Sequence, residues 1–164
     1  MEPEEVRIRC GEWDLRSEEE WFGHQDRDVD SFTIHPEYFD NKDKLWNDIA
    51  LVHVKKDFDV SLAPICLPQL YGTDFLTGEN DCVSMGWGKK SSDADEYEVS
   101  MKQIRLPMVP NDQCQQALRD KTLLFSRWKL HPSFVCAGGI EGEDACDGDG
   151  GGPLVCRAKD DPDR

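Results

Sequence analysis

Acidic side chains gather in the first part of the chain, where their spacing suits cation chemistry. Residues 11–30 contain eight carboxylates, namely Glu12, Asp14, Glu18, Glu19, Glu20, Asp26, Asp28 and Asp30. So many charges cannot all be buried, and the segment is therefore predicted to be a solvated loop. A bound cation would relieve the repulsion between the carboxylates, so hydration and cation binding are both open interpretations.

The cysteines point to disulfide chemistry. The chain has seven cysteines in 164 residues and no C-x-x-C pair of the kind that builds zinc sites or redox motifs. Disulfides form in oxidising compartments, which predicts an extracellular protein. An odd number means that at least one cysteine pairs outside this chain, stays free or has lost its mate to truncation. The acidic residues 1–5 differ from the basic start of a secretory signal, so no export segment is expected here.

Overall charge and hydropathy exclude several classes of partner. Acidic residues number 34 and basic ones 19, giving a formal net charge of −15. This charge disfavours binding to nucleic acids and to membranes through basic patches. Apolar residues make up 38% of the chain, enough to bury a core, but runs such as 49–54 are far shorter than the roughly 20 residues that span a bilayer.

Short strands dominate the elements that must position these residues. Polar and apolar side chains alternate over residues 31–35. Residues 48–54 and 81–87 form short runs rich in β-branched and apolar side chains. The best helix candidate is 111–118, with Asn111 or Asp112 as its N-cap. Prolines and glycines separate these segments, which predicts an all-β fold with ordered loops.

Three segments, in the right order, resemble the trypsin-like (chymotrypsin-type) serine protease family. Asn47 to Val52 resembles the segment whose aspartate, here Asp48, orients the catalytic histidine. Residues 81–88 resemble the strand that opens the second barrel, and residues 146–156 resemble the loop that carries the nucleophile. The resemblance implies a double six-stranded antiparallel β-barrel, incomplete at both ends, with one or two short helices.

The resemblance also implies the domain organisation and the disulfides. Residues 1–164 would be part of one trypsin-like domain, with residues 1–68 the remainder of the first barrel and residues 69–164 a second barrel truncated at its C-terminus. Each disulfide would contribute about 3 to 5 kcal/mol in the chain-entropy model. The implied pairs are Cys82–Cys156 and Cys114–Cys136, with Cys66 and Cys146 joined to segments outside this chain and Cys10 unassigned.

Gly150 stands where the family has its nucleophilic serine, and a glycine has no side chain to attack a carbonyl. Loss of the nucleophile alone costs on the order of 10⁶ in turnover. Nearby, Gly148 matches an oxyanion-hole donor and Asp149 the aspartate that receives the new N-terminus after zymogen cleavage. Asp144 matches the carboxylate at the base of the pocket for a lysine or arginine side chain; an inherited, solvated acid is the alternative.

The family's catalytic histidine has no counterpart in this sequence. It lies in an Ala-Ala-His-Cys stretch upstream of the aspartate, and none of the four histidines fits that context. We expect surface or structural roles for all of them: His24, His35, His53 and His131.

Residues 6–14, 24–27 and 34–38 together resemble arthropod clip-domain protease homologues. In that group, loss of the nucleophilic serine is common, and members act in haemolymph as non-cleaving cofactors of prophenoloxidase activation. The resemblance therefore implies a secreted binding protein that requires no cofactor of its own. Its partners would be prophenoloxidase, its activating protease and recognition proteins.

Two alternatives remain at this stage. One is an active trypsin-like endopeptidase, which would need a serine at position 150 and an upstream histidine. The other is a calcium-dependent recognition module, because the family binds calcium in the loop that here holds Glu12, Asp14, Glu19 and Glu20. Carboxylate oxygens suit that ion.

Overall fold

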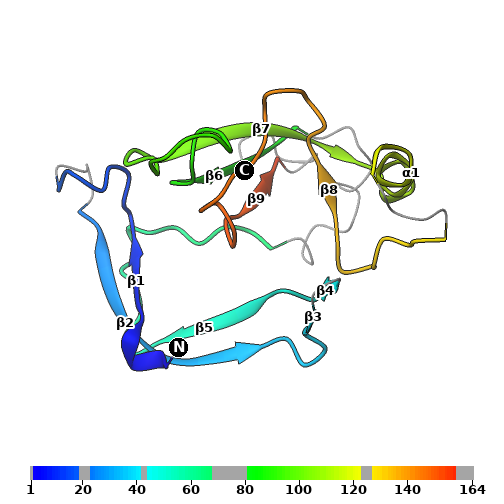
Figure 1. Ribbon diagram of the computed structural model, residues 1–164. Coiled ribbons are helices and arrows are strands. Elements are labelled where there is room, and N and C mark those ends of the chain that lie inside the picture. Colours follow the sequence, from blue (N-terminus) through cyan, green and yellow to red (C-terminus); the bar gives the residue numbers. More distant parts are fainter. Residues whose placement is uncertain (1, 19–22, 42–43, 68–80, 123–126, 158–164) are drawn as a thin grey trace. The chain divides into compact units, whose positions relative to one another are not determined.

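The computed structural model describes residues 2–18, 23–41, 44–67, 81–122 and 127–157 (Figure 1). Two compact units are present: unit 1 consists of Met1–Ile65 and Val99–Met101, and unit 2 of Cys66–Glu98 and Lys102–Arg164. No helix in the described ranges is long and apolar enough to cross a membrane.

Unit 1 is built from short antiparallel strands. Its elements are the 3-10 turn η1 (Pro3–Glu5) and the strands β1 (Arg7–Cys10), β2 (Gln25–Ile34), β3 (Phe39–Asn41), β4 (Lys44–Trp46) and β5 (Ala50–Val54). Strands β1, β2 and β5 form one sheet with β2 in the centre, and β3 pairs with β4. Val29 of β2 is fully buried and marks the core of this unit.

The register of β1 on β2 corrects the loop predicted for residues 11–30. Arg7 lies opposite Asp28 and Arg9 opposite Asp26, so basic and acidic side chains face each other across the two strands. Opposite charges at paired positions stabilise an antiparallel ladder. The second half of the acidic segment is therefore strand and not loop.

Unit 2 contains one sheet and the single α-helix of the described residues. Its elements are β6 (Asp81–Gly86), β7 (Lys102–Val109), α1 (Asn111–Lys121), β8 (Cys136–Ala137) and β9 (Leu154–Cys156). The sheet order is β8-β7-β6-β9, with antiparallel pairing throughout. Cys82, Leu106 and Met108 are its buried apolar side chains.

The all-β class and the single short helix agree with the sequence-based prediction, whereas the predicted cap of the helix is wrong. The N-cap of α1 is Pro110, and no side chain caps the helix. Asn111 instead donates from Nδ2 to the carbonyl oxygen of Phe134 (3.0 Å), which binds the helix to the segment before β8. This tertiary contact competes with local capping and prevails.

Candidate functional site

The loop around Gly150 follows directly from turn chemistry. The N–H of Asp149 donates to the carbonyl of Cys146 and the N–H of Gly152 donates to the carbonyl of Asp149, both at 3.0 Å. Gly148 has φ 95°, a left-handed conformation that disfavours any residue with a Cβ. The resulting double turn leaves Gly150 exposed.

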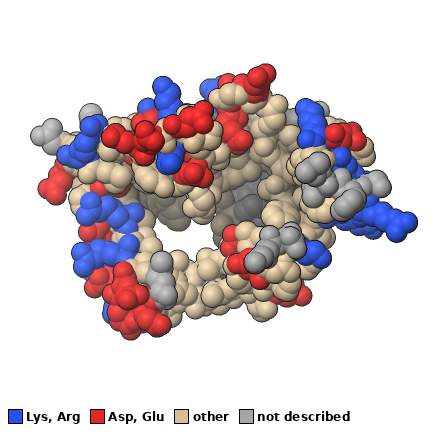
Figure 2. Space-filling view, viewed as in Figure 1, with Lys and Arg blue, Asp and Glu red and all other residues tan. Residues whose placement is uncertain are grey.

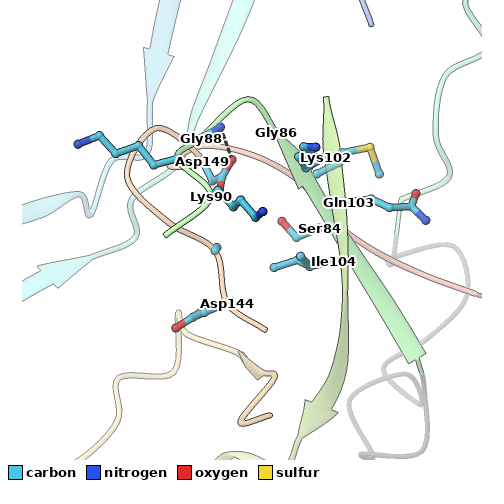
Figure 3. A pocket seen from close by; sticks show the side chains of 12 residues that line it. Ser84, Gly86, Gly88, Lys90, Lys102, Gln103, Ile104, Asp144 and Asp149 are labelled. Carbon is cyan, nitrogen blue, oxygen red and sulfur yellow. Dashed lines mark hydrogen bonds between the residues drawn. The ribbon is translucent and has the colours of Figure 1, made fainter. Parts of the chain in front are cut away.

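The carboxylate of Asp149 anchors this loop to the segment that follows β6 in the same unit (Figure 3). Its Oδ1 accepts the N–H of Gly88 (2.8 Å), and its Oδ2 accepts the N–H of Cys146 (3.0 Å). A Cβ at Gly86 or Gly88 would collide with this carboxyl group, so both positions need glycine. The side chain that the resemblance connects with zymogen activation is thus held by two backbone amides.

Replacing Asp149 by alanine is expected to lower the free energy of unfolding by about 1–3 kcal/mol, because the buried N–H of Gly88 would lose its acceptor. Urea denaturation of the full chain measures the loss. Asp147→Ala is the matched control, because among the described residues Asp147 is hydrogen-bonded only through its backbone carbonyl, by the N–H of Lys89, and a loss of less than about 0.5 kcal/mol is expected. Equal losses in the two variants would contradict the anchoring role of Asp149.

Gly150 itself has room for a side chain and lacks one. A Cβ built at this position meets no heavy atom within 4 Å. In the described residues, the N–H groups of Gly148 and Gly150 donate to no acceptor, so they are free to bind an oxygen of a ligand. The loop can therefore offer backbone donors, but no side chain at position 150.

Asp48 lies in unit 1, separated from the start of β5 by Ile49, and is exposed. The turn that carries it is fixed by Asn47, which has φ 51° and donates from Nδ2 to the carbonyl of Glu37 (2.8 Å). Partial burial and the carboxylates of Asp40 and Asp48 raise the pKa of the Tyr38 phenol. The place of Asp48 relative to Gly150 stays a prediction.

The four histidines have other partners than Asp48. Nε2 of His53 lies 3.0 Å from Oγ1 of Thr33, and Nδ1 of His35 accepts the N–H of Glu37 at 3.1 Å. His131 bonds locally to Ser133, and Nδ1 of His24 lies 3.5 Å from Oε2 of Glu12. Among the described residues, no Asp–His pair of the catalytic type is formed.

Asp144 lines a cavity of about 210 Å³ in unit 2, together with Asp149, Ser84 and Ile104. Three lysines, Lys89, Lys90 and Lys102, line the same cavity. Figure 3 shows Lys90 and Ser84 turned into it, with Asp144 on a separate segment of its wall. The ammonium groups of these lysines would repel a cationic ligand, so the binding of a basic side chain at Asp144 stays a prediction.

Of the acidic residues proposed for calcium, Glu12 and Asp14 are described, and each is engaged by other groups of the protein. The Glu12 side chain is only 3% exposed and lies against Arg9 (3.1 Å) and His24, whereas Asp14 accepts hydrogen bonds from the Ser100 hydroxyl (2.7 Å) and from the N–H of Arg16. These hydrogen bonds lower the pKa of Asp14. The described ranges contain no group of three or more metal-binding side chains. As placed, Glu12 and Asp14 do not fit one calcium site; Glu19 and Glu20 lie outside the described residues.

Two disulfides are formed, Cys82–Cys156 between neighbouring strands β6 and β9, and Cys114–Cys136 between α1 and β8. They are the two pairs that the resemblance implied. Cys10 and Cys146 form no disulfide with the described residues, and Cys66 is exposed. Partial burial raises the pKa of the Cys10 thiol, which keeps it protonated at neutral pH and hence weakly reactive.

Arg9 is the residue that sequence reasoning missed. Its guanidinium bonds Asp26 at two points, from Nε (2.7 Å) and from Nη2 (3.0 Å), and bonds Glu12 from Nη1. These bonds raise the pKa of Arg9 and lower that of Asp26. The alternation of Arg7 and Arg9 with Asp26 and Asp28 was the available signal, but it identifies partners only once the register is known.

Two β units and a Gly-Asp-Gly loop anchored through Asp149 are typical of the trypsin class of proteins. The trypsin family model matches residues 2–160, so the chain belongs to the trypsin family. The structure resembles that of neuropsin, a serine protease expressed in the limbic system of mouse brain, with a TM-score of 0.73 and 25% identity over 93% of this chain and 62% of that one. The predicted trypsin-like double-barrel class is thereby confirmed.

Two curated relatives come from insects. The chain is 40% identical to phenoloxidase-activating factor 2 of Galleria mellonella, over 92% of this chain and 49% of that protein. It is 39% identical to the inactive CLIP domain-containing serine protease A8 of Anopheles gambiae, over 89% of this chain and 39% of that protein. The chain thus spans half or less of the length of these relatives.

Proposed function

We propose that this chain belongs to a secreted trypsin-family protein that binds its partners without cleaving them. The observation that carries the proposal is Gly150, which stands at the nucleophile position in a loop whose other features are kept. The anchoring of that loop by Asp149 supports a binding surface, because the loop is held rigidly although it has no hydroxyl to position. Relatives whose names call them inactive support the same conclusion.

The biological setting that we propose is prophenoloxidase activation in haemolymph. Its support is the similarity to phenoloxidase-activating factors and to inactive CLIP domain-containing proteases. The partners would be prophenoloxidase, its activating protease and recognition proteins. The two disulfides formed are typical of an extracellular protein.

The test uses the product of the full-length transcript, expressed with its disulfides and cut by limited proteolysis. We expect no hydrolysis of arginyl or lysyl peptide substrates, together with a faster activation of prophenoloxidase by its protease. Heat-denatured protein is the control for the second assay. Hydrolysis at protease-like rates would overturn the proposal, because the nucleophile would then lie elsewhere than at position 150.

A further inference from the structure

An open pocket of about 400 Å³ lies in unit 1 and plays no part in the chemistry of the Gly150 loop. Three neighbouring segments form its wall: Arg7 of β1, Asp26–Asp28 of β2, and Lys55 and Lys56 directly after β5. The N–H of Lys55 donates to the carbonyl of Asp28 (2.9 Å). This bond holds the two lysines beside β2.

The two acidic side chains in the pocket already have cationic partners. Asp26 receives two hydrogen bonds from Arg9, at 2.7 and 3.0 Å. Nε of Arg7 lies 3.4 Å from Oδ1 of Asp28. Each of the two carboxylates thus has an arginine partner on β1 before any ligand arrives.

The remaining cations differ in how they are held. Arg27 is a rigid part of the wall: its side chain is 12% exposed, donates to the carbonyl of Asp57 (2.9 Å) and to Gln25 (2.7 Å), and stacks on Phe58. Lys55 and Lys56 are exposed, and neither ammonium group has an ion pair in the described part of the chain. Nη2 of Arg27 also lies 3.6 Å from Oδ1 of Asp59, so the positive charge left for an anionic ligand is that of the two lysine ammonium groups.

We propose that this pocket binds an acidic peptide segment of a partner protein, with its carboxylates against Lys55 and Lys56. A peptide suits the site better than a dense polyanion, because acidic side chains alternate with the basic ones over β1 and β2 (Figure 2). Those acids would repel a continuous array of sulfates or phosphates, whereas a peptide with spaced carboxylates can place them next to the two lysines only. The inference rests on the proposed function, since it supplies a docking surface for a partner that is not cleaved.

Fluorescence anisotropy tests the pocket with a labelled peptide of alternating glutamate and glycine, and with its glutamine analogue. The full chain is expected to bind the first peptide and not the second, more weakly at about 0.15 M ionic strength than in low salt. The double variant Lys55→Gln, Lys56→Gln is expected to bind about tenfold more weakly, since it loses two exposed charge pairs. Lys44→Gln, at an exposed lysine of β4, is the matched control and should stay within about twofold.

Equal binding by the natural chain and the double variant would overturn the inference. So would a heparin oligosaccharide that binds more tightly than the peptide and depends on the same two lysines, because the site would then suit polyanions. Circular dichroism confirms that each variant is folded. Failure of peptide binding leaves the proposed function intact if the protein still accelerates prophenoloxidase activation without hydrolysing peptides.

Discussion

The variant Gly150→Ser of the full-length transcript product is expected to gain hydrolysis of arginyl peptides, by a factor on the order of up to 10⁶. A serine fits without strain, because a Cβ at this position meets no heavy atom within 4 Å. Its hydroxyl would then stand in the anchored loop, beside the N–H groups of Gly148 and Gly150, which donate to no acceptor within the described part of the chain. The gain is measured as kcat/KM, with thermal unfolding to show unchanged stability.

Two controls make this result interpretable. Gly150→Ala adds the same Cβ without a hydroxyl, so it should stay inert and equally stable. The 164-residue chain alone should stay inert even with serine at position 150, because none of its four histidines matches the catalytic one. A stable but inert Gly150→Ser protein of full length would show that catalysis was lost at more than the nucleophile.

The double variant Cys82→Ala, Cys156→Ala is expected to lose about 4–5 kcal/mol of unfolding free energy. The bond closes a separation of 74 residues and joins β6 to β9, and Cys82 is fully buried. Only four apolar side chains are buried among the described residues, Val29, Cys82, Leu106 and Met108, so the bond contributes a large share of the stability. Urea denaturation without reductant measures the loss.

The second disulfide is the matched control, because the change in composition is the same. Cys114–Cys136 spans a separation of 22 residues, so its double alanine variant should lose about 3 kcal/mol. If the variant without Cys82–Cys156 does not fold at all, the refolding yields of the two variants show which disulfide contributes more. A larger loss on removing Cys114–Cys136 would contradict the entropic argument.

The strands were largely predictable, whereas the partners of polar side chains were not. Alternation at residues 31–35 and the run at residues 81–87 predicted parts of β2 and β6, which both occur. The acidic residues of β2 by themselves predict a loop, because their local pattern does not contain the arginines that face them from β1. The same reason explains Asn111, which caps nothing and instead binds the carbonyl of Phe134.

The sequence by itself determined which chemical groups this protein has at each position. A glycine at position 150 excludes a side-chain nucleophile there in any fold. The tertiary structure alone decided which charged side chains are paired within the protein and which stay available to a ligand. Asp149 is bound by the amides of Gly88 and Cys146, Glu12 is buried against Arg9, and Lys55 is held next to β2. These outcomes depend on strand register and on contacts between segments distant in the chain, which residue types do not specify.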